Sequence, residues 1–519
     1  MMDFLDPKKG RASVVRLWIG YALLAVAIVL AAIVLLYQAS GFGVGSDGKV
    51  IQNGLVFVSS NPPDASIYLN GKKQGDATNT RLVIQSGTYT MRLARDGYRD
   101  WQRAVVIEGG DVEHVDYPFL VPKSLTTSKV SDYQSAPPLT VQSPDRRWLL
   151  AQVPGAMASF DMYDLKDPEK VTQQKTTVEV PAAVFGLAQP GQQSLELAEW
   201  SRDNQHVLLK HTVGEQWEYV LVSRSKPVES VNLTKQLQLK PADVPTMRDK
   251  KYDQYFVHDT VARTLTTTVL DKPVPQPFLT SVVAFKSYGN DVAVYATEDG
   301  ASAGNVSIRM YQDEKTYTIR QLPKSDKYLL DISTYGNDWY AAVGSATDEH
   351  LYVYENVVQR LREDASQPLV PVDILKLDNP NYLQFSANSQ FVMVENGQDV
   401  AVYDVENERS YTYKVTQPID LPQQHMSWID GYHLAFVSQG KLVMMDFDGT
   451  NAQTLSPASP DYLPFFDTSY QSLYTMTKPE VITATTPAGS AAASQTVTSP
   501  QPGIPPSLTV TSLRTERDR

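Results

Sequence analysis

The sequence contains no cysteine among its 519 residues. This absence excludes disulfide bonds, thiolate metal sites and cysteine nucleophiles. A protein that leaves the cytoplasm without disulfides must be held together by burial of its hydrophobic core alone. That combination is more typical of an exported bacterial or archaeal protein than of a small eukaryotic secreted protein.

Positive charge is scarce relative to negative charge, because 46 Lys and Arg residues stand against 58 Asp and Glu residues and leave a net charge of −12. Residues 1–16 carry four basic and two acidic side chains, so the rest of the chain carries −14. A chain this acidic is repelled by phosphate backbones and by anionic lipid head groups. The composition therefore argues against nucleic acid as a partner.

One long stretch, residues 17–37, lacks charged side chains altogether and has the length of about 20 residues that a membrane-spanning helix needs. Four basic residues precede it in residues 1–16, and no basic residue follows until Lys49. The positive-inside rule then keeps residues 1–16 in the cytoplasm and exports everything after residue 37. We expect a single-pass cell-membrane protein, with the membrane itself as one partner through residues 17–37.

A cleaved signal peptide is the competing interpretation, since the small residues Ala39, Ser40 and Gly41 follow the apolar run. The hydrophobic region of a signal peptide is about 7–15 residues long, which is shorter than this run. A buried core helix also fits poorly, because such a helix shows one polar face. We therefore interpret the run as an uncleaved anchor, followed by a flexible Gly- and Ser-rich linker over residues 38–52.

Residues 53–122 contain short apolar strands at regular spacing, separated by turn-forming residues. Strands of this length and spacing predict a small all-β sandwich. Within it Ala65, Ile67 and Leu69 alternate with polar residues, so we expect these three side chains to face the core. The turns fall at Pro62-Pro63-Asp64, Asn70-Gly71, Ser86-Gly87, Asp96-Gly97 and Gly109-Gly110.

The order of these turns resembles that of a PEGA domain. The residues that carry the resemblance are Ser60, Pro62, Ala65, Ile67, Asn70-Gly71, Gly75, Ser86-Gly87, Tyr89 and Gly97-Tyr98. The Pro-Glu-Gly-Ala turn of the family corresponds to residues 62–65, where Pro63 and Asp64 replace Glu and Gly. Asp tolerates a positive φ, so the change at position 64 is mild. The resemblance implies a β-sandwich of an exported surface protein and implies no catalytic residue.

Residues 123–477 repeat a unit that consists of an aromatic residue or Ser, a polar turn, and a strand with apolar alternation. This content and the spacing of about 40–60 residues predict a β-propeller built of four-stranded blades. The segments SPDRRWLLA and MDFDGTNAQTLSP also resemble blade elements of TolB-like propellers. Eight units begin, at residues 143, 200, 247, 285, 333, 385, 428 and 466.

The last unit leaves little room for its outer strands, so we expect about seven blades, with residues near 123–141 completing the final sheet. A set of separate β-sandwiches is the alternative, but no long Pro-, Gly- or Ser-rich linker divides residues 123–477.

Residues 478–519 are rich in Thr, Ala, Ser and Pro and are predicted to be a disordered tail. A short docking motif is the alternative for its end, formed by Leu508, Val510, Leu513, Arg514, Arg517 and Arg519.

Two motifs invite a catalytic or metal-binding interpretation. Residues 300–304 match the G-x-S-x-G pattern of a hydrolase elbow, which requires a strand before it and a helix after it. Strand-like segments flank the motif on both sides, so we predict a hairpin turn. Asp446 and Asp448 begin like a calcium loop, but the twelfth position is Pro457 where an EF-hand needs Glu.

Single titratable residues give no stronger signal. None of the seven His residues forms an H-x-x-x-H pair, and no phosphate-binding lysine motif occurs. Asp203, Asp249 and Asp430 recur in the blade turns and could line one end of a propeller channel. Asp is also favoured in turns for conformational reasons alone. The sequence therefore identifies no catalytic, cofactor-binding or metal-binding residue.

These features together predict an all-β extracytoplasmic protein that is anchored in the cell envelope and is not an enzyme. We expect a binding or scaffold role in which the propeller contacts an envelope protein or a glycan. The alternative is a membrane-anchored hydrolase or lyase with its site at the propeller channel. Three or more carboxylate, His or Arg side chains converging in a deep channel mouth would favour the enzyme, whereas a Tyr-rich end face would favour binding.

Overall fold

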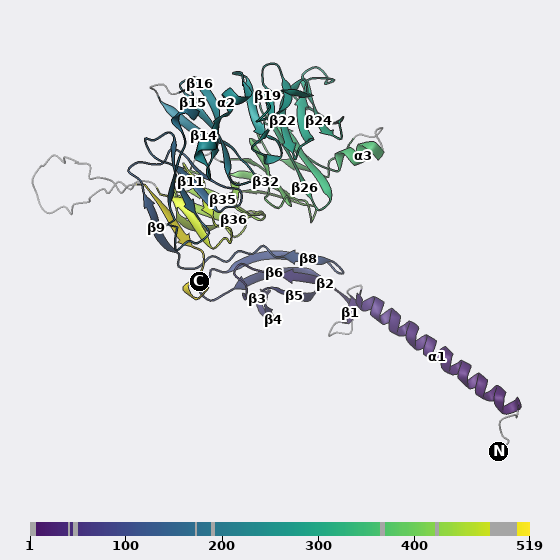
Figure 1. The fold of residues 1–519 in the computed structure, drawn as a ribbon. Helices are drawn as coiled ribbons and strands as arrows, with labels where there is room; N and C mark the ends of the chain where they lie inside the picture. The colour runs from purple at the N-terminus through teal and green to yellow at the C-terminus, as the bar shows by residue number, and fades with distance from the viewer. Residues whose placement is uncertain are drawn as a thin grey trace, which may run out of the picture. The chain divides into compact units, whose positions relative to one another are not determined.

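The computed structural model describes residues 7–39, 42–44, 50–171, 174–187, 192–363, 369–420, 425–477 and 506–518. The chain divides into two compact units, Met1–Ser124 and Leu125–Arg519. Short antiparallel sheets dominate both units (Figure 1). Each unit is described separately below.

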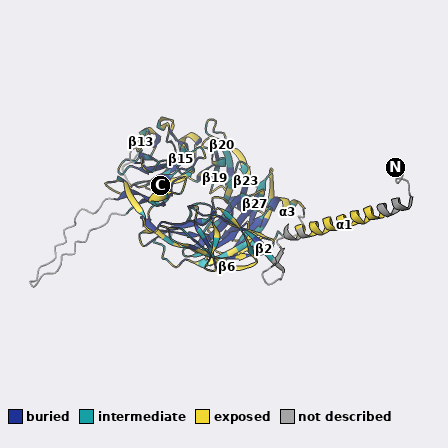
Figure 2. Ribbon diagram, turned by 90° about the horizontal axis from the view of Figure 1, so that it is seen from below, coloured by how far each residue is buried: buried dark blue, intermediate teal, exposed yellow. Residues whose placement is uncertain are grey.

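The first unit begins with the helix α1 (Pro7–Ala39). Its segment Val15–Ile33 is long and apolar enough to cross a membrane, and none of this segment is buried against the rest of the chain (Figure 2). At 1.5 Å per residue, 19 helical residues extend about 28 Å, close to the thickness of a hydrocarbon core. An apolar helix with no protein surface to cover it is stable where lipid covers it.

Two four-stranded sheets follow in the first unit. In the first sheet β2 pairs with β1, with β5 and, in parallel, with β8, while the second sheet has the order β4-β3-β6-β7. The strands are β1 (Phe42–Val44), β2 (Val50–Val58), β3 (Ser66–Leu69), β4 (Lys72–Ala77), β5 (Thr80–Gln85), β6 (Gly87–Ala94), β7 (Trp101–Ile107) and β8 (Val112–Val115). This arrangement is the predicted sandwich.

The core of the sandwich contains the side chains that the alternation predicted. Ala65 and Ile67 are fully buried, and Leu69 is nearly so. They join a core that also holds the fully buried Trp101. Asp64 has a φ of 63°, so the Asp that stands in the family's Gly position does adopt the left-handed conformation that it was expected to tolerate.

The linker predicted over residues 38–52 was wrong at two places. Residues 42–44 form β1, and β2 already begins at Val50, where it pairs with β1 in the register Phe42↔Gln52. Gly-rich composition concealed these strands, because backbone pairing with a neighbour does not depend on apolar side chains. The same reason explains why β4, with the polar sequence KKQGDA, was not predicted.

The second unit contains eight four-stranded sheets, here numbered 1 to 8 along the chain. Sheets 1–7 are consecutive meanders formed by β10–β13, β14–β17, β18–β21, β22–β25, β26–β29, β30–β33 and β34–β37. Their first strands are Thr140–Gln142, Gln193–Trp200, Asp243–Met247, Val282–Tyr288, Tyr328–Tyr335, Tyr382–Phe385 and Ser427–Trp428. Their second strands are Trp148–Gln152, His206–Val213, Gln254–Asp259, Val292–Thr297, Asp338–Ser345, Phe391–Asn396 and His433–Ser438.

The third and fourth strands complete each meander. The third strands are Ser159–Asp164, Gln216–Ser223, Thr264–Val269, Asn305–Gln312, His350–Glu355, Asp399–Asp404 and Lys441–Asp446. The fourth strands are Thr176–Glu179, Val231–Asn232, Gln276–Leu279, Lys315–Pro323, Asp373–Lys376, Arg409–Lys414 and Gln453–Pro457. Two short α-helices accompany the described strands of this unit. The helix α2 (Leu233–Leu237) directly follows β17, the fourth strand of sheet 2, and α3 (Val357–Glu363) lies between the third and fourth strands of sheet 5.

The sheets follow one another around a ring. The first strands β22, β26 and β30 of sheets 4, 5 and 6 lie side by side. Hydrophobic clusters join sheets 1 and 2, 2 and 3, 3 and 4, 4 and 5, and 5 and 6. A further cluster joins sheet 8 back to sheet 1 through Tyr474, Leu508 and Leu149. The second unit is therefore a closed β-propeller with eight blades.

Sheet 8 is assembled from both ends of the unit. Its strand order is β38 (Phe465–Phe466), β39 (Ser472–Met476), β40 (Ser507–Ser512) and β9 (Thr126–Asp132). The expectation that residues near 123–141 complete the final sheet is confirmed, because β9 is its outermost strand. In Figure 1 β9, from the start of the unit, lies beside strands from its end.

Two predictions about the end of the chain were wrong. The propeller has eight sheets rather than about seven, and the segment 506–518 is part of its last sheet rather than of a disordered tail. Leu508 and Leu513 are buried, so the proposed docking motif is a core strand. The remainder of the predicted tail, residues 478–505, lies outside the described residues. The strand was missed because it is separated from β39 by a long segment whose composition dominated the prediction.

Ring closure depends on β40, and truncating one of its side chains tests this. Leu508 is 1% exposed, so Leu508→Ala leaves a cavity and is expected to lower the free energy of unfolding by about 2–5 kcal/mol. The matched control is Leu463→Ala, at a leucine that is 53% exposed, where a change within about 0.5 kcal/mol is expected. Denaturant unfolding followed by tryptophan fluorescence measures both variants. Equal effects of the two substitutions would contradict a core role for β40.

Candidate functional site

The turns between the first and second strands of the eight sheets share one end of the propeller. Each sheet is an antiparallel meander whose first strand lies at the ring axis, so these first strands all run in the same direction. The connections between first and second strands, here called first turns, therefore lie together. We call this side of the propeller the first-turn end.

Polar side chains in the first turns hold the turn backbone. In sheet 8 the carboxylate of Asp467 accepts hydrogen bonds from the backbone N–H groups of Gln471 and Ser472, at 2.8 and 3.1 Å. In sheet 1 the hydroxyl of Ser143 accepts a bond from the N–H of Trp148 at 3.0 Å. Such contacts explain the repeated polar turn in the sequence as a structural device.

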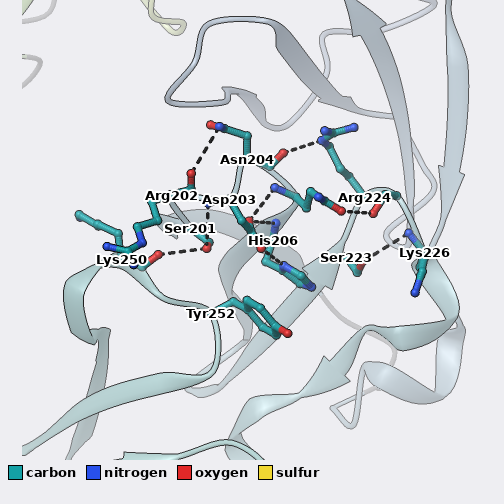
Figure 3. A network of polar contacts seen from close by, with 12 residues as sticks. Ser201, Arg202, Asp203, Asn204, His206, Ser223, Arg224, Lys226, Lys250 and Tyr252 are labelled. Atoms are coloured by element: carbon teal, nitrogen blue, oxygen red, sulfur yellow. Dashed lines mark hydrogen bonds and ion pairs between the residues drawn. The ribbon is translucent and has the colours of Figure 1, made fainter. Parts of the chain in front are cut away.

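Asp203 occupies the same kind of position in sheet 2 (Figure 3). Its carboxylate accepts the backbone N–H groups of Gln205 and His206 at 2.8 and 3.2 Å, and its second oxygen lies 2.6 Å from Nδ1 of His206. Burial alone would raise the pKa of Asp203, but the Gln205 N–H and the His206 ring together lower it. Asp203 is thus an ionised turn residue whose hydrogen-bonding capacity is used locally.

Asp249 and Asp430 are also engaged by neighbouring side chains, and the partner Arg202 of Asp249 comes from the first turn of sheet 2. Asp249, at a φ of 53°, pairs with Arg202 at 2.7 Å and with Lys251 at 3.2 Å. Asp430 contacts the ring of His433 at 2.8 Å. The three carboxylates belong to the first turns of sheets 2, 3 and 7, and each is held by its own neighbours. The structure does not bring them together as a catalytic group.

The two sequence motifs have structural roles. Residues 300–304 form the loop between β23 and β24, where Ser302 donates a hydrogen bond to the side-chain oxygen of Gln321 at 2.6 Å, so the hairpin-turn prediction is confirmed. Asp448 lies in the turn between β36 and β37 and accepts the N–H of Thr450 at 3.1 Å. Among the described residues, no group of three or more His, Asp or Glu side chains is arranged to hold a metal ion.

His433 forms a buried charge cluster within sheet 7. Its Nδ1 lies 2.8 Å from Asp430, and its Nε2 lies 3.5 Å from Asp446, another buried carboxylate. Burial opposes protonation of the ring, but Asp430 and then Asp446 outweigh burial and raise the pKa of His433 above its ordinary value. The imidazolium therefore links two carboxylates within the sheet, and loss of its charge would remove an attractive interaction from both of them.

Aromatic side chains recur at the first-turn end. Tyr252 is 37% exposed and Tyr288 is 38% exposed, which is unusual for rings of this size. Further rings at or beside first turns are half-buried, and they come from sheets 1, 5, 7 and 8: Trp148, Tyr335, Trp339, Tyr432 and Tyr470. We call these seven side chains the aromatic face. Tyr and Trp offer a large apolar surface together with a polar tip, which suits contact with a partner.

The rings of the aromatic face are held in place by neighbours. Tyr252 stacks on His206 at 3.8 Å between ring centroids (Figure 3). Tyr288 packs edge-to-face with Trp339 at 5.1 Å, and its hydroxyl lies 3.0 Å from that of Thr334. Rings fixed in this way lose little conformational entropy when a partner binds.

A cavity of about 750 Å³ opens beside Tyr288 and extends along the first strands of sheets 3 and 4. At the first-turn end it is lined by Asp249, Lys250, Tyr288 and Gly289, and further along by Val244, Thr260 and Val283. Its volume falls within the range of about 300–1,000 Å³ that is common for ligand sites.

The charged groups of the cavity wall are paired. Glu199 accepts the backbone N–H of Met247 at 2.6 Å and forms an ion pair with Lys250. On the other side Lys286 lies 3.4 Å from the buried carboxylate of Asp331. Asp331 also accepts the N–H of Phe385 at 2.9 Å, so this carboxylate joins the first strands of sheets 5 and 6.

The titratable groups of the cavity wall make hydrogen bonds or ion pairs with their neighbours. His258, the histidine in its wall, is buried, and its Nε2 lies 3.0 Å from the carbonyl oxygen of Val282. Each carboxylate of the wall already contacts a lysine, an arginine or a backbone N–H. A general base needs a lone pair directed at the substrate, whereas the half-exposed ammonium groups of Lys250 and Lys286 retain donors for a ligand.

Most of these residues could not be identified from sequence patterns. Glu199 and Asp331 sit inside strands, where a single carboxylate carries no motif, and they are linked to residues about 50 positions away. The aromatic face had one detectable signal, since several of its rings lie at the ends of first strands, next to the polar turns. Their common location became visible only once the strands were placed around a ring.

The charge cluster of His433 predicts a pH-dependent stability. Because the pKa of His433 is raised in the folded state, its contribution is fully present below the unfolded value of about 6.5 and is lost as pH rises through the folded value. Thermal unfolding between pH 6 and 9 should show this loss in the wild type. His433→Gln should be less stable at low pH and lack the loss.

His350→Gln is the matched control, at a histidine whose side chain is 36% exposed. We expect it to keep the pH profile of the wild type. A wild-type profile that is retained in His433→Gln would contradict the assignment of the pH dependence to this cluster.

Comparisons with known proteins give a family match for the first unit and only weak structural alignments for the chain as a whole. A comparison with curated proteins found no significant match. Solved propellers align at low similarity, with TM-scores of 0.34, 0.34 and 0.35 and identities of 12%, 11% and 11%. They are Hsv2 of Kluyveromyces lactis, the Cps50 (Swd1) propeller domain of Myceliophteria thermophila and an oligogalacturonate lyase of Vibrio parahaemolyticus.

These alignments cover 61%, 67% and 76% of this chain and 97%, 95% and 98% of the respective structures. The assignment of a propeller therefore rests on the ring of eight sheets described above. For the first unit the comparison is more specific, since residues 53–120 match the model of the PEGA domain. The resemblance drawn from the turn residues is confirmed, and the chain combines an apolar N-terminal helix, a PEGA domain and a β-propeller.

Proposed function

We propose that the protein is a membrane-anchored, extracytoplasmic binding or scaffold protein of the cell envelope. The helix α1 anchors the chain with its N-terminus in the cytoplasm, and the propeller contacts an envelope protein or a glycan. The observation that carries this proposal is the aromatic face, where fixed Tyr and Trp rings from six of the eight sheets share one end.

Three features support this proposal over other partners. The net charge of −14 after residue 16 disfavours nucleic acid. Rigid aromatic side chains are the residue types that most often dominate binding energy at interfaces. The PEGA domain and the apolar helix are consistent with an exported, anchored chain.

A hydrolase or lyase with its site in the propeller channel is the second candidate. The cavity favours it to the extent that Glu199, Asp249 and His258 all line the same wall. The hydrogen bonds and ion pairs of these three groups weigh against it. Incubating the purified full-length protein with envelope glycan and assaying new reducing ends separates the two candidates. We expect the wild type to produce no new reducing ends. New reducing ends that appear with the wild type and are absent with Glu199→Gln would establish the enzyme instead.

Anchoring predicts how the protein fractionates. We expect the full-length chain to stay with the membrane pellet in high salt and to be released by detergent, because Val15–Ile33 is fully exposed apolar helix. A matched variant replaces Leu23 and Val26, both exposed within α1, by Lys, which should abolish membrane retention. Release of the wild type by salt alone would contradict the anchor.

The aromatic face predicts where a partner touches the propeller. A photo-crosslinking phenylalanine derivative at Tyr288 should form adducts with an envelope protein or glycan in intact cells. The control position is Val261, which is 82% exposed and lies in a turn at the opposite end. With the crosslinking residue placed at Tyr252 instead, Tyr288→Ala should lower the adduct yield about fivefold or more, as expected when a ring worth over 1 kcal/mol of binding free energy is lost. Equal adduct yields at Tyr288 and Val261 would contradict partner binding through the aromatic face.

A further inference from the structure

The PEGA domain has a sheet edge at β5 that carries little of the usual protection. β5 pairs with β2 on one side, and no other strand of the described chain pairs with its second side. Edge strands are normally guarded by charges, bulges or short length, because their free N–H and C=O groups attract other strands. The edge strand β4 of the other sheet follows that rule, with Lys72 and Lys73 exposed and a register shift against β3.

The free hydrogen-bonding groups of β5 can be assigned from its register. The N–H of Ser86 donates to the carbonyl oxygen of Gln52 at 2.9 Å, and the register continues through Ile84↔Gly54 and Leu82↔Val56. Hydrogen-bonded residues alternate along an antiparallel strand. Residues 82, 84 and 86 therefore bond to β2, while the N–H and C=O groups of residues 81, 83 and 85 point to the free edge.

The side chains of β5 are apolar at the centre and polar at the ends. Val83 is 71% exposed, and Leu82 and Ile84 are half-buried on either side of it. Arg81 and Gln85 are exposed and flank this apolar centre. The carbonyl oxygen of Gln85 already accepts a hydrogen bond from the Tyr89 hydroxyl at 2.9 Å. The outward N–H and C=O groups of residues 81 and 83 and the N–H of residue 85 therefore form the part of the strand edge that can pair.

We propose that β5 pairs with β5 of a second copy of this chain, antiparallel and with Val83 on the two-fold axis. In this register Arg81 lies opposite Gln85, and Val83 lies opposite Val83. These are the residues whose backbone N–H and C=O groups point outward. At the centre of the edge these groups therefore form hydrogen bonds with the second copy. Leu82 lies opposite Ile84, so apolar residues meet apolar residues on the other face of the new pair.

The self-complementary pattern is the reason for choosing a second copy as the occupant. A two-fold axis places residue i of one strand opposite residue j of the other, and residue j opposite residue i. The two side chains of each opposed pair must therefore be compatible. The sequence TRLVIQ meets this condition around Val83, whereas a register shifted by one residue would place the inward-directed residues 82 and 84 at the bonding positions.

The pairing is expected to be weak in dilute solution, since one added strand pair of six residues contributes little buried area. Anchoring in a membrane, as proposed above, would raise the effective concentration of one copy near another. Self-association does not depend on the propeller or its partner. Its failure would leave the proposed binding function untouched, and loss of the binding function would leave the pairing in place.

The absence of cysteine makes a direct test possible in native membranes. In the full-length chain Val83→Cys should form a covalent dimer with a short bismaleimide, because facing residues in a hydrogen-bonded pair have Cα atoms about 5.5 Å apart. The matched control is Val106→Cys on β7, an edge strand of the other sheet, where the valine is 45% exposed. We expect at least a tenfold higher dimer yield at position 83. Equal yields, or no dimer at position 83, would overturn the proposal.

A second measurement uses two differently tagged full-length copies in one membrane. Val83→Lys places two ammonium groups face to face across the axis and should reduce co-capture at least fivefold. Val106→Lys should leave co-capture unchanged. Both sites are exposed, so both variants should unfold at the wild-type temperature. Co-capture that survives Val83→Lys, or that is absent from the wild type, contradicts pairing through β5.

Discussion

The propeller depends on the insertion of β40 between β39 and β9. In a chain without cysteine no covalent bond closes the ring, so closure relies on backbone pairing and on burial of Leu508 and its neighbours. The strand arrives from the far end of the chain and meets the strand that begins the unit. A propeller closed in this way joins its first and last residues into one sheet, and the other seven sheets are held in place by packing against one another.

Closure also fixes the geometry of the first-turn end. Because each first strand is held between its neighbours, the rings of the aromatic face keep their relative positions without any flexible loop. Carboxylates on first strands reinforce this rigidity. Asp331 of sheet 5 accepts a backbone N–H from sheet 6, and Glu199 of sheet 2 accepts one from sheet 3. A rigid, aromatic end with paired charges is the feature that supports the proposed binding role.

The local parts of the fold were predictable from the sequence, and the long-range parts were not. The core face of β3 and the positive φ of Asp64 follow from alternation and turn chemistry, which act over a few residues. β4 and β1 were missed because backbone pairing tolerates polar and Gly-rich sequences. β40 was missed because its alternation of Leu508 and Val510 was averaged with the segment before it, and the blade count changed with it.

The candidate site shows the same division. The turn carboxylates form a repeated pattern that is visible in the sequence. The pattern reflects a structural role, since each carboxylate contacts residues in or next to its turn. The residues that form the aromatic face share no motif and are related only by the direction of the first strands. In this repeat fold the repeated sequence unit marks the blades. The rings of the aromatic face stand at scattered positions of the sequence and come to one end only when the blades are arranged in a ring.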